Sequence, residues 1–241
     1  MTITKLYQEL RDALRKEIKR NNLSGQKVSV SCRPLSATEA IGKPVDEDYP
    51  IIKGKETVVE AVFEGGRGQA FTDEFENANY RVEELLEIEL DSNRRRASFI
   101  SGLNAVFRHL NLCDKTIHCK DSEPKKCAKN LLETLEPGNK VFLVGFQPRF
   151  LEILASNRTV RVVDLDQENI SRKVSGIVIE PPKMTAEAIT WCDLIFATGS
   201  TVVNGTITDF INKGKPVLFY GVTISATAKI LNLNTYCHYG H

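Results

Sequence analysis

The stretch from Cys192 to Phe210, CDLIFATGSTVVNGTITDF, constrains the fold more than any other part of this chain. Its residues Asp193 to Ala197 form an apolar run of strand length, and the hydroxyl-rich turn Thr198 to Thr201 follows at once. Apolar residues then recur at helical spacing from Val203 to Ile211, which predicts a helix with one apolar face. In an open α/β sheet, such a turn lies at the carboxyl end of the strand, where these sheets bind ligands. We therefore expect a binding site at this turn.

The C-terminal half of the chain continues this alternation of strands and helices. The pattern predicts strands over 140–144, 159–165, 176–179 and 216–220, and helices over 150–154, 185–191 and 223–231. The segment from Lys140 to Val144 is a continuous apolar strand, as in a parallel sheet that is buried on both faces. Strands that alternate with helices predict a doubly wound parallel sheet with right-handed crossovers.

The N-terminal half has a different organisation. Apolar residues at i, i+4 spacing over 3–20, with charged residues between them, predict an amphipathic helix. Strands are predicted over 26–32, 57–64 and 69–72, a loop over 34–55, a glycine-rich turn over 65–68, and helices over 82–90, 94–110 and 128–135. We place a boundary near Pro137, which gives a small α+β domain over 1–137 and an α/β domain over 138–241.

The charge of the chain is nearly balanced, with 32 basic and 31 acidic residues and a net charge of +1. This balance provides no global field for nucleic acid or for an anionic membrane, and no apolar run is long enough to predict a transmembrane helix. The charged N-terminus lacks the apolar core of a signal peptide, so we expect a cytoplasmic protein whose six cysteines are reduced. Cys113, His118, Cys119 and Cys127 lack the short spacing of structural zinc sites, so we predict no metal site among them.

Four loops are expected at the carboxyl ends of the strands of the parallel sheet. They lie over 145–149, 164–167, 198–204 and 221–223, and parallel topology gathers them on one edge. At the central turn, Ser200 or Thr201 can cap the following helix, and the unpaired N–H groups behind it favour an anion. Asn204 adds a side-chain amide, and Gly205 within a helical pattern indicates that another group approaches the backbone. No general base stands beside these hydroxyls, which argues against a nucleophilic serine.

Two further features are open to alternative interpretations. Asp164 follows Gly145 by 19 residues, the spacing at which an acidic residue holds a ribose in nucleotide-binding folds. It either contacts a nucleotide or adenosyl ligand, or ends a strand and caps the next segment. The run Arg94-Arg95-Arg96 stands at a helix start, where cations are slightly unfavourable. It either marks an acidic ligand or partner, or forms a solvated face.

Five segments of the chain look like known family motifs: ATGSTVVNGTI, LFYGVT, GGRGQAFTD, ASFISGLNAV and VGFQPRF. They resemble motifs of the bacterial and archaeal family called putative heavy-metal chelation proteins. The resemblance implies an enolase-N-terminal-like domain followed by a Rossmann-like domain, a cleft between them, and a homodimer. Matched position by position, the cleft would include Gly145, Phe146, Pro148, Asp164, Thr198, Gly199, Ser200, Thr201, Asn204 and Gly221, and from the first domain Gly68, Thr72 and Asn104. An acidic or Cys/His metal shell is not evident at these positions.

We expect from these features a protein that binds a small anionic or metal-associated ligand in an interdomain cleft, with heavy-metal chelation as the activity that the resemblance implies. Two alternatives stay open. One is a nucleotide- or S-adenosylmethionine-using enzyme with Asp164 on the ribose, and the other is an interaction protein whose cleft is vestigial. The sequence identifies neither a catalytic residue nor a cofactor.

Overall fold

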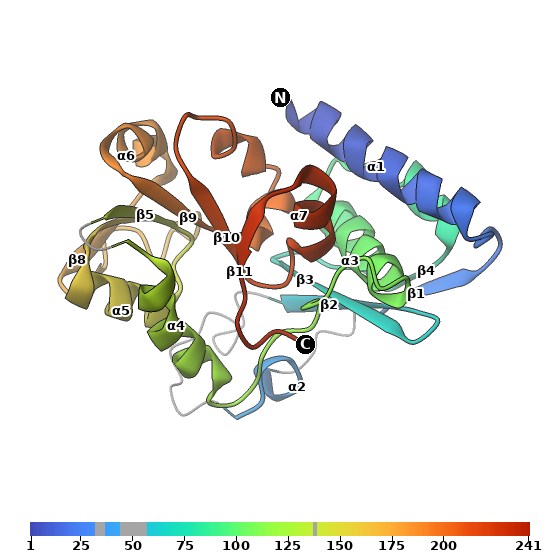
Figure 1. Ribbon diagram of the computed structural model, residues 1–241, viewed down its shortest axis with the longest axis horizontal. Coiled ribbons are helices and arrows are strands. Elements are labelled where there is room, and N and C mark those ends of the chain that lie inside the picture. The colour runs from blue at the N-terminus through green and yellow to red at the C-terminus, as the bar shows by residue number, and fades with distance from the viewer. Residues whose placement is uncertain (32–36, 44–56, 137–138) are drawn as a thin grey trace.

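Two β-sheets organise the computed structural model, which describes residues 1–31, 37–43, 57–136 and 139–241 (Figure 1). Among these residues the first sheet has the strand order β3-β2-β1-β4, and the second has the order β11-β10-β9-β5-β6-β8-β7. Helices α3 (Asn93–His109) and α7 (Ser225–Leu231) pack against each other between the two sheets. None of the helices in these ranges is long and apolar enough to cross a membrane.

Most of the predicted elements form, within a few residues of the predicted bounds. The first sheet contains β1 (Lys27–Ser31), β2 (Thr57–Phe63), β3 (Gly66–Thr72) and β4 (Ala78–Arg81). The second contains β5 (Lys140–Val144), β6 (Thr159–Val163), β7 (Lys173–Val174), β8 (Ile177–Glu180), β9 (Leu194–Thr198), β10 (Val217–Tyr220) and β11 (Asn234–Tyr236). The remaining α-helices are α1 (Ile3–Arg20), α2 (Ala37–Ile41), α4 (Glu123–Thr134), α5 (Pro148–Asn157) and α6 (Thr185–Trp191). The 3₁₀ segments are η1 (Val82–Glu87), η2 (Pro182–Met184), η3 (Gly199–Val202) and η4 (Ile207–Asp209). The sequence pattern missed β4, β7, β11 and α2, which are short; the rest of the predicted loop over 34–55, apart from 37–43, lies outside the described residues.

The first sheet is antiparallel, and α3 packs against β2 and β3. Helix α1 is amphipathic as predicted, because Leu6, Leu10 and Leu14 are fully buried while the charged residues between them are exposed or partly exposed. The side chain of Thr2 caps this helix by accepting a hydrogen bond from the Lys5 N–H.

The glycine-rich stretch differs from the predicted turn over 65–68. The hairpin turn consists of Glu64 and Gly65, with φ angles of 45° and 82°, and β3 already begins at Gly66. Gly68 lies inside the strand, where an added Cβ would come within 2.3 Å of the Ala105 backbone nitrogen. The glycine therefore permits the close approach of α3 to the sheet, and any larger residue would push the helix away.

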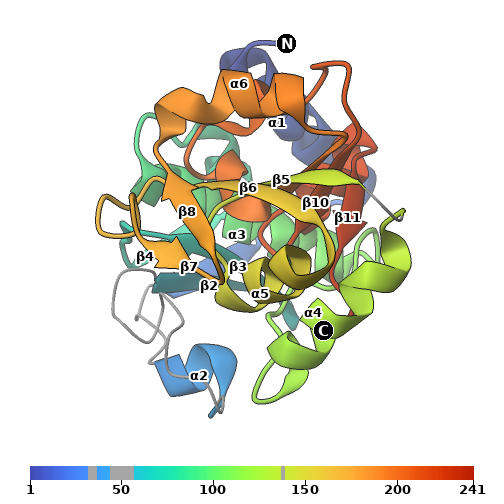
Figure 2. The ribbon, with the colours of Figure 1, turned by 90° about the vertical axis from the view of Figure 1, so that its left-hand side faces the viewer.

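The second sheet confirms the predicted parallel α/β architecture. Its strands run parallel, except that β7 pairs antiparallel with β8. In β5, Phe142 and Val144 pack on the side of α6, whereas Val141 and Leu143 pack on the side of α4 and α5. Figure 2 shows α6 on one side of the sheet and α4 and α5 on the other. Because both faces are covered by helices, the strand sequence is apolar without alternation.

The predicted helix after β9 is wrong. The backbone from Gly199 to Asp209 forms the 3₁₀ segments η3 and η4 with a turn between them. Gly205 has a φ of +75°, a left-handed conformation that no α-helix contains, and the Thr206 N–H bonds to the Thr201 carbonyl. Val203, Ile207 and Phe210 are nevertheless buried. The helical spacing thus identified the buried side chains correctly but not the backbone conformation.

The proposed domain boundary near Pro137 falls on residues 137–138, which lie outside the described residues. Apolar side chains of α1, α3, β5 and β9, among them Leu10, Phe99, Phe142 and Ile195, belong to one continuous buried cluster. The two sheets therefore share a core, and their separation into an enolase-N-terminal-like and a Rossmann-like domain stays a prediction.

Candidate functional site

A cavity of about 640 Å³ lies between the two sheets, at the carboxyl ends of the strands of the second sheet. The chain enters this sheet at β5, adds β6 and β8 on one side, and then returns to place β9 on the other side of β5. The loops after β5 and β9 therefore diverge, which opens a crevice at this point of the sheet. A volume of this size is typical of small-molecule sites.

Nine of the thirteen predicted cleft residues line this cavity. They are Thr72, Gly145, Phe146, Asp164, Thr198, Ser200, Thr201, Asn204 and Gly221. The tertiary structure thus brings together the loops after β5, β6, β9 and β10, and it adds the end of β3 from the first sheet.

Three of the other four predicted residues position the elements that line the cavity. Pro148 is buried at the first position of α5, and Gly68 packs under α3. At Gly199, an added Cβ would come within 2.9 Å of the Ile224 backbone nitrogen. A glycine is therefore required for the loop after β9 to contact the loop after β10.

Asn104, the fourth, is a fully buried cross-link between the two sheets. Its Nδ2 donates to the carbonyls of Gln69 and Thr223 at 3.0 and 3.1 Å, and to that of Val222 at 3.4 Å. Its Oδ1 accepts the Ala226 N–H at 2.9 Å. Because Ala226 lies in the first turn of α7, this N–H has no partner within the helix. Asn104 thus supplies the acceptor for this N–H of α7 and holds the loop after β10 against β3.

The loop after β5 depends on Gly145, which has a φ of +85°. A Cβ at this position would come within 2.9 Å of the Thr198 Cγ2 and 3.1 Å of the Tyr220 hydroxyl. That hydroxyl lies 3.1 and 3.0 Å from the carbonyl oxygens of Val144 and Gly145. Both the conformation and the crowding therefore require glycine where the strands β5, β9 and β10 meet.

The turn after β9 is capped by Thr198, and the prediction of Ser200 or Thr201 as the cap is wrong. The Thr198 Oγ1 accepts the Ser200 N–H at 3.2 Å and lies 3.3 Å from the Ser200 Oγ. The Thr201 hydroxyl donates to the Thr198 carbonyl at 2.8 Å. Strand β9 extends to Thr198, so this residue, and not Ser200 or Thr201, adopts the extended conformation that capping requires.

Asp164 fixes two of the loops that border the cavity. Its Oδ2 accepts the Phe146 N–H at 2.5 Å, and its Oδ1 accepts the Asp166 N–H at 2.8 Å. Each carboxylate oxygen thus already holds a backbone donor. This arrangement matches the interpretation of Asp164 as a residue that ends a strand and caps the next segment.

The described residues that line the cavity carry negative charge. Five of them are acidic: Asp73, Asp164, Asp166, Glu168 and Asp209. No lysine or arginine from the described ranges is among them. The field inside the cavity therefore disfavours a free anion and favours a ligand that carries positive charge.

Three thiols line the cavity, and the sequence pattern missed one of them. Cys119 and Cys127 line it together with Cys237, which is more than a hundred residues away in the chain. Burial raises the pKa of Cys237 to about 11 and also raises that of Cys119, so both are protonated at neutral pH. In the described part of the chain, no group of three His, Cys, Asp or Glu side chains is arranged to hold a metal ion.

His118 lies beside these thiols and is uncharged at neutral pH. Burial lowers its pKa, and its Nδ1 lies 2.6 Å from the Cys119 carbonyl oxygen, which identifies Nδ1 as the protonated nitrogen.

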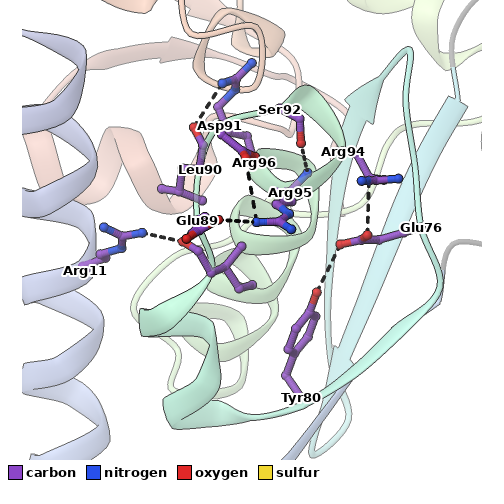
Figure 3. Close-up of polar contacts among 11 residues, drawn as sticks. Arg11, Glu76, Tyr80, Glu89, Leu90, Asp91, Ser92, Arg94, Arg95 and Arg96 are labelled. Carbon is purple, nitrogen blue, oxygen red and sulfur yellow. Dashed lines mark hydrogen bonds and ion pairs between the residues drawn. The ribbon is translucent and has the colours of Figure 1, made fainter.

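The arginine run at the start of α3 forms contacts within the chain (Figure 3). Arg94 pairs with Glu76 at 3.2 Å, and Arg95 pairs with Glu89 at 2.9 Å. Arg96 has carbonyl and amide acceptors instead, and its Nε donates to the Val203 carbonyl at 2.5 Å. The run is therefore neither a free basic patch nor a fully solvated face. Near Gly205, the groups that approach the backbone are the Arg96 guanidinium and the Tyr7 hydroxyl.

Comparison with known proteins identifies solved structures that are similar to this chain. No curated protein matches the chain. A solved structure of a protein of unknown function from the DUF364 family of Pyrococcus horikoshii is 16% identical, covers 90% of this chain and 79% of its own, and has a TM-score of 0.54. A second one, from Desulfitobacterium hafniense DCB-2 and also of unknown function, is 14% identical, covers 73% of this chain and 72% of its own, and has a TM-score of 0.49. The first of these shows a shared fold.

The family resemblance expected from the sequence motifs is confirmed for the C-terminal part of the chain. Residues 130–233 match the profile of the family DUF364, described as putative heavy-metal chelation. The matched region extends from within α4 to just beyond α7 and includes the loops after β5, β6, β9 and β10 that border the cavity, but not Tyr236 and Cys237. Over these 104 residues, 130–233, the chain is therefore similar to the DUF364 family of putative heavy-metal chelation proteins.

Proposed function

We propose that this protein binds a small, metal-associated ligand in the cavity between its two sheets. The observation that carries the proposal is the cavity itself, which has a volume of about 640 Å³ and lies at the strand ends where parallel sheets bind ligands. The family description, heavy-metal chelation, agrees with a ligand of this kind.

The chemistry of the cavity wall favours a metal-associated ligand over a free anion. The five acidic side chains that line it would repel an uncompensated anion, and the described lining residues offer no lysine or arginine to offset them. A chelate brings its own cation, whose positive charge offsets the negative charge of the ligand atoms and is attracted by these carboxylates. Because the described residues form no ready-made metal shell, the ligand atoms would supply most of the coordination, and carboxylates or thiols of the wall would add to it.

The turn after β9 would hold the uncharged polar atoms of such a ligand. Ser200 and Asn204 line the cavity and are only partly buried, so both can contact a bound molecule. The apolar and aromatic groups of Val144, Phe146 and Phe150 form another part of the wall. A ligand with an apolar part beside a chelated cation would complement these surfaces.

The two alternatives have less support. A nucleotide or adenosyl ligand with Asp164 on the ribose would have to share the carboxylate oxygens with the N–H groups of Phe146 and Asp166. An interaction protein with a vestigial cleft does not account for polar loops that converge from four strands.

We also propose, from the sequence and the family resemblance, that the protein is cytoplasmic and forms a homodimer.

Native mass spectrometry and elemental analysis of freshly purified full-length protein test the proposal. We expect the wild type to carry a bound mass together with a metal. Ser200→Phe, which fills the cavity, should lose both, whereas the matched variant Ser156→Phe on the exposed face of α5 should retain both. A bound mass that contains adenosine would support the nucleotide alternative. A wild type with neither a bound mass nor a metal would contradict the proposal and favour the vestigial cleft.

A further inference from the structure

A second cavity, of about 370 Å³, lies between α1 and the turn after β9. Its lining includes Tyr7 and Arg11 from α1, Arg96 from α3, and Asn204 and Gly205 from the turn. We propose that this cavity binds a small oxyanion such as phosphate. The site is separate from the large cavity, although Asn204 borders both.

Two guanidinium groups in this cavity have no carboxylate partner among the residues that the structure describes. Arg11 donates to the Ile88 carbonyl at 2.5 Å, and its Nε is buried without an acceptor among the described residues. Arg96 donates to the carbonyls of Leu90 and Val203 and to the Asn93 side-chain oxygen. All these acceptors are uncharged, so two positive charges share one partly buried space that no carboxylate of the described residues neutralises.

The neighbouring carboxylates do not neutralise this charge. Glu89 and Asp91 flank Leu90, but the structure directs them towards Arg95, at 2.9 and 3.8 Å (Figure 3). The described residues that line the second cavity include neither aspartate nor glutamate. Taking a guanidinium partly out of water without a counter-charge is unfavourable, and a bound anion would remove this cost.

The remaining groups of the cavity are compatible with an oxyanion. Burial raises the pKa of Tyr7 to about 12, so its hydroxyl stays protonated and donates to the Val202 carbonyl at 2.6 Å. It therefore adds no negative charge. The side chains of Thr4 and Asn204 also line the cavity and can donate hydrogen bonds. Arginine binds oxyanions through parallel, charge-assisted hydrogen bonds, which are among the stronger polar contacts in proteins.

Isothermal titration of full-length protein with inorganic phosphate, at constant ionic strength maintained with chloride, tests this inference. We expect saturable binding of one phosphate by the wild type. Arg11→Gln should weaken it at least about ten-fold, because a charged donor pair is lost. Arg11→Lys keeps the charge but not the forked geometry, so it should bind more weakly than wild type and more tightly than Arg11→Gln.

Arg15→Gln is the matched control, because Arg15 is an exposed arginine of the same helix that pairs with Asp12. It should leave the phosphate affinity unchanged. A wild type without saturable binding at tens of millimolar phosphate, or Arg11 variants that both bind as wild type does, would overturn the inference. If Arg11→Gln fails to fold, the Arg11→Lys comparison decides alone. The titration uses phosphate only, so its failure would leave the proposed metal-associated ligand untouched.

Discussion

Replacing Asn104 with alanine should destabilise the protein by more than the loss of one hydrogen bond, because this side chain bonds to four backbone groups. The substitution removes the acceptor of the Ala226 N–H and the amide shared by the carbonyls of Gln69 and Thr223, all at a fully buried position. An orphaned buried donor costs about 1–3 kcal/mol, and with the lost carbonyl bonds we expect a total of about 2–4 kcal/mol. For a chain of this size each kcal/mol lowers the melting temperature by about 2–4 °C, so Asn104→Ala should melt roughly 4–16 °C lower.

Asn104→Asp tests which atoms of the side chain matter. An aspartate keeps an oxygen for the Ala226 N–H, but it places a second, charged oxygen against the carbonyls of Gln69 and Thr223. Buried charge without a partner is costly, so at pH 7 this variant should be less stable than Asn104→Ala. At low pH the protonated carboxyl can donate again, and the difference between the two variants should shrink.

Thermal unfolding followed by circular dichroism measures both effects. Asn157→Ala is the control, because the Asn157 amide donates to the Ile153 carbonyl at an exposed helix end, where substitutions usually change stability by less than about 0.5 kcal/mol. If Asn104→Ala melts as close to wild type as the control does, the buried hydrogen bonds do not hold α7 and the loop after β10 in the way we infer.

Four further predictions concern the turn after β9, the thiols, His118 and the assembly. Thr198→Val should lower stability by about 1 kcal/mol, because Thr198 caps the turn, whereas Ser200→Ala should have a smaller effect; equal losses in thermal melting would contradict the assignment of the cap. The unfolded, non-reduced protein should react with close to six equivalents of a thiol reagent, since the described cysteines are free and Cys32 lies outside the described residues; a count of four or fewer would indicate a disulfide. Burial lowers the pKa of His118, so below about pH 6.5 the unfolded chain binds a proton more readily than the folded protein, and stability should decrease as the pH falls. The urea midpoint of His118→Gln should therefore fall less than that of the wild type between about pH 7.5 and pH 5, and an equal fall in the two proteins would refute this. Light scattering at tens of micromolar should give the mass of a dimer, and a monomer would contradict the proposed assembly.

The sequence alone determined the elements whose signals are local. The apolar runs of β5 and β9 predict a parallel sheet because a strand buried on both faces cannot contain regular polar positions. The leucines of α1 predict its buried face because side chains four residues apart share one side of a helix. The motifs around Thr198 and Gly145 indicated the family and the loops of the cavity, since the tight turns at strand ends restrict the residue types that fit.

Only the tertiary structure decided the features that depend on distant residues. Helical spacing after β9 marked buried positions, but the left-handed Gly205 and the packing of the turn against α1 and α3 make the backbone 3₁₀ instead of α-helical. Cys237 joins Cys119 at the cavity because β11 pairs with β10, and strand pairing of this kind is not encoded in local periodicity. The separation of charge between the two cavities has the same origin. Carboxylates and guanidinium groups that are evenly mixed along the chain are sorted into one acidic and one basic space only when the two sheets pack together.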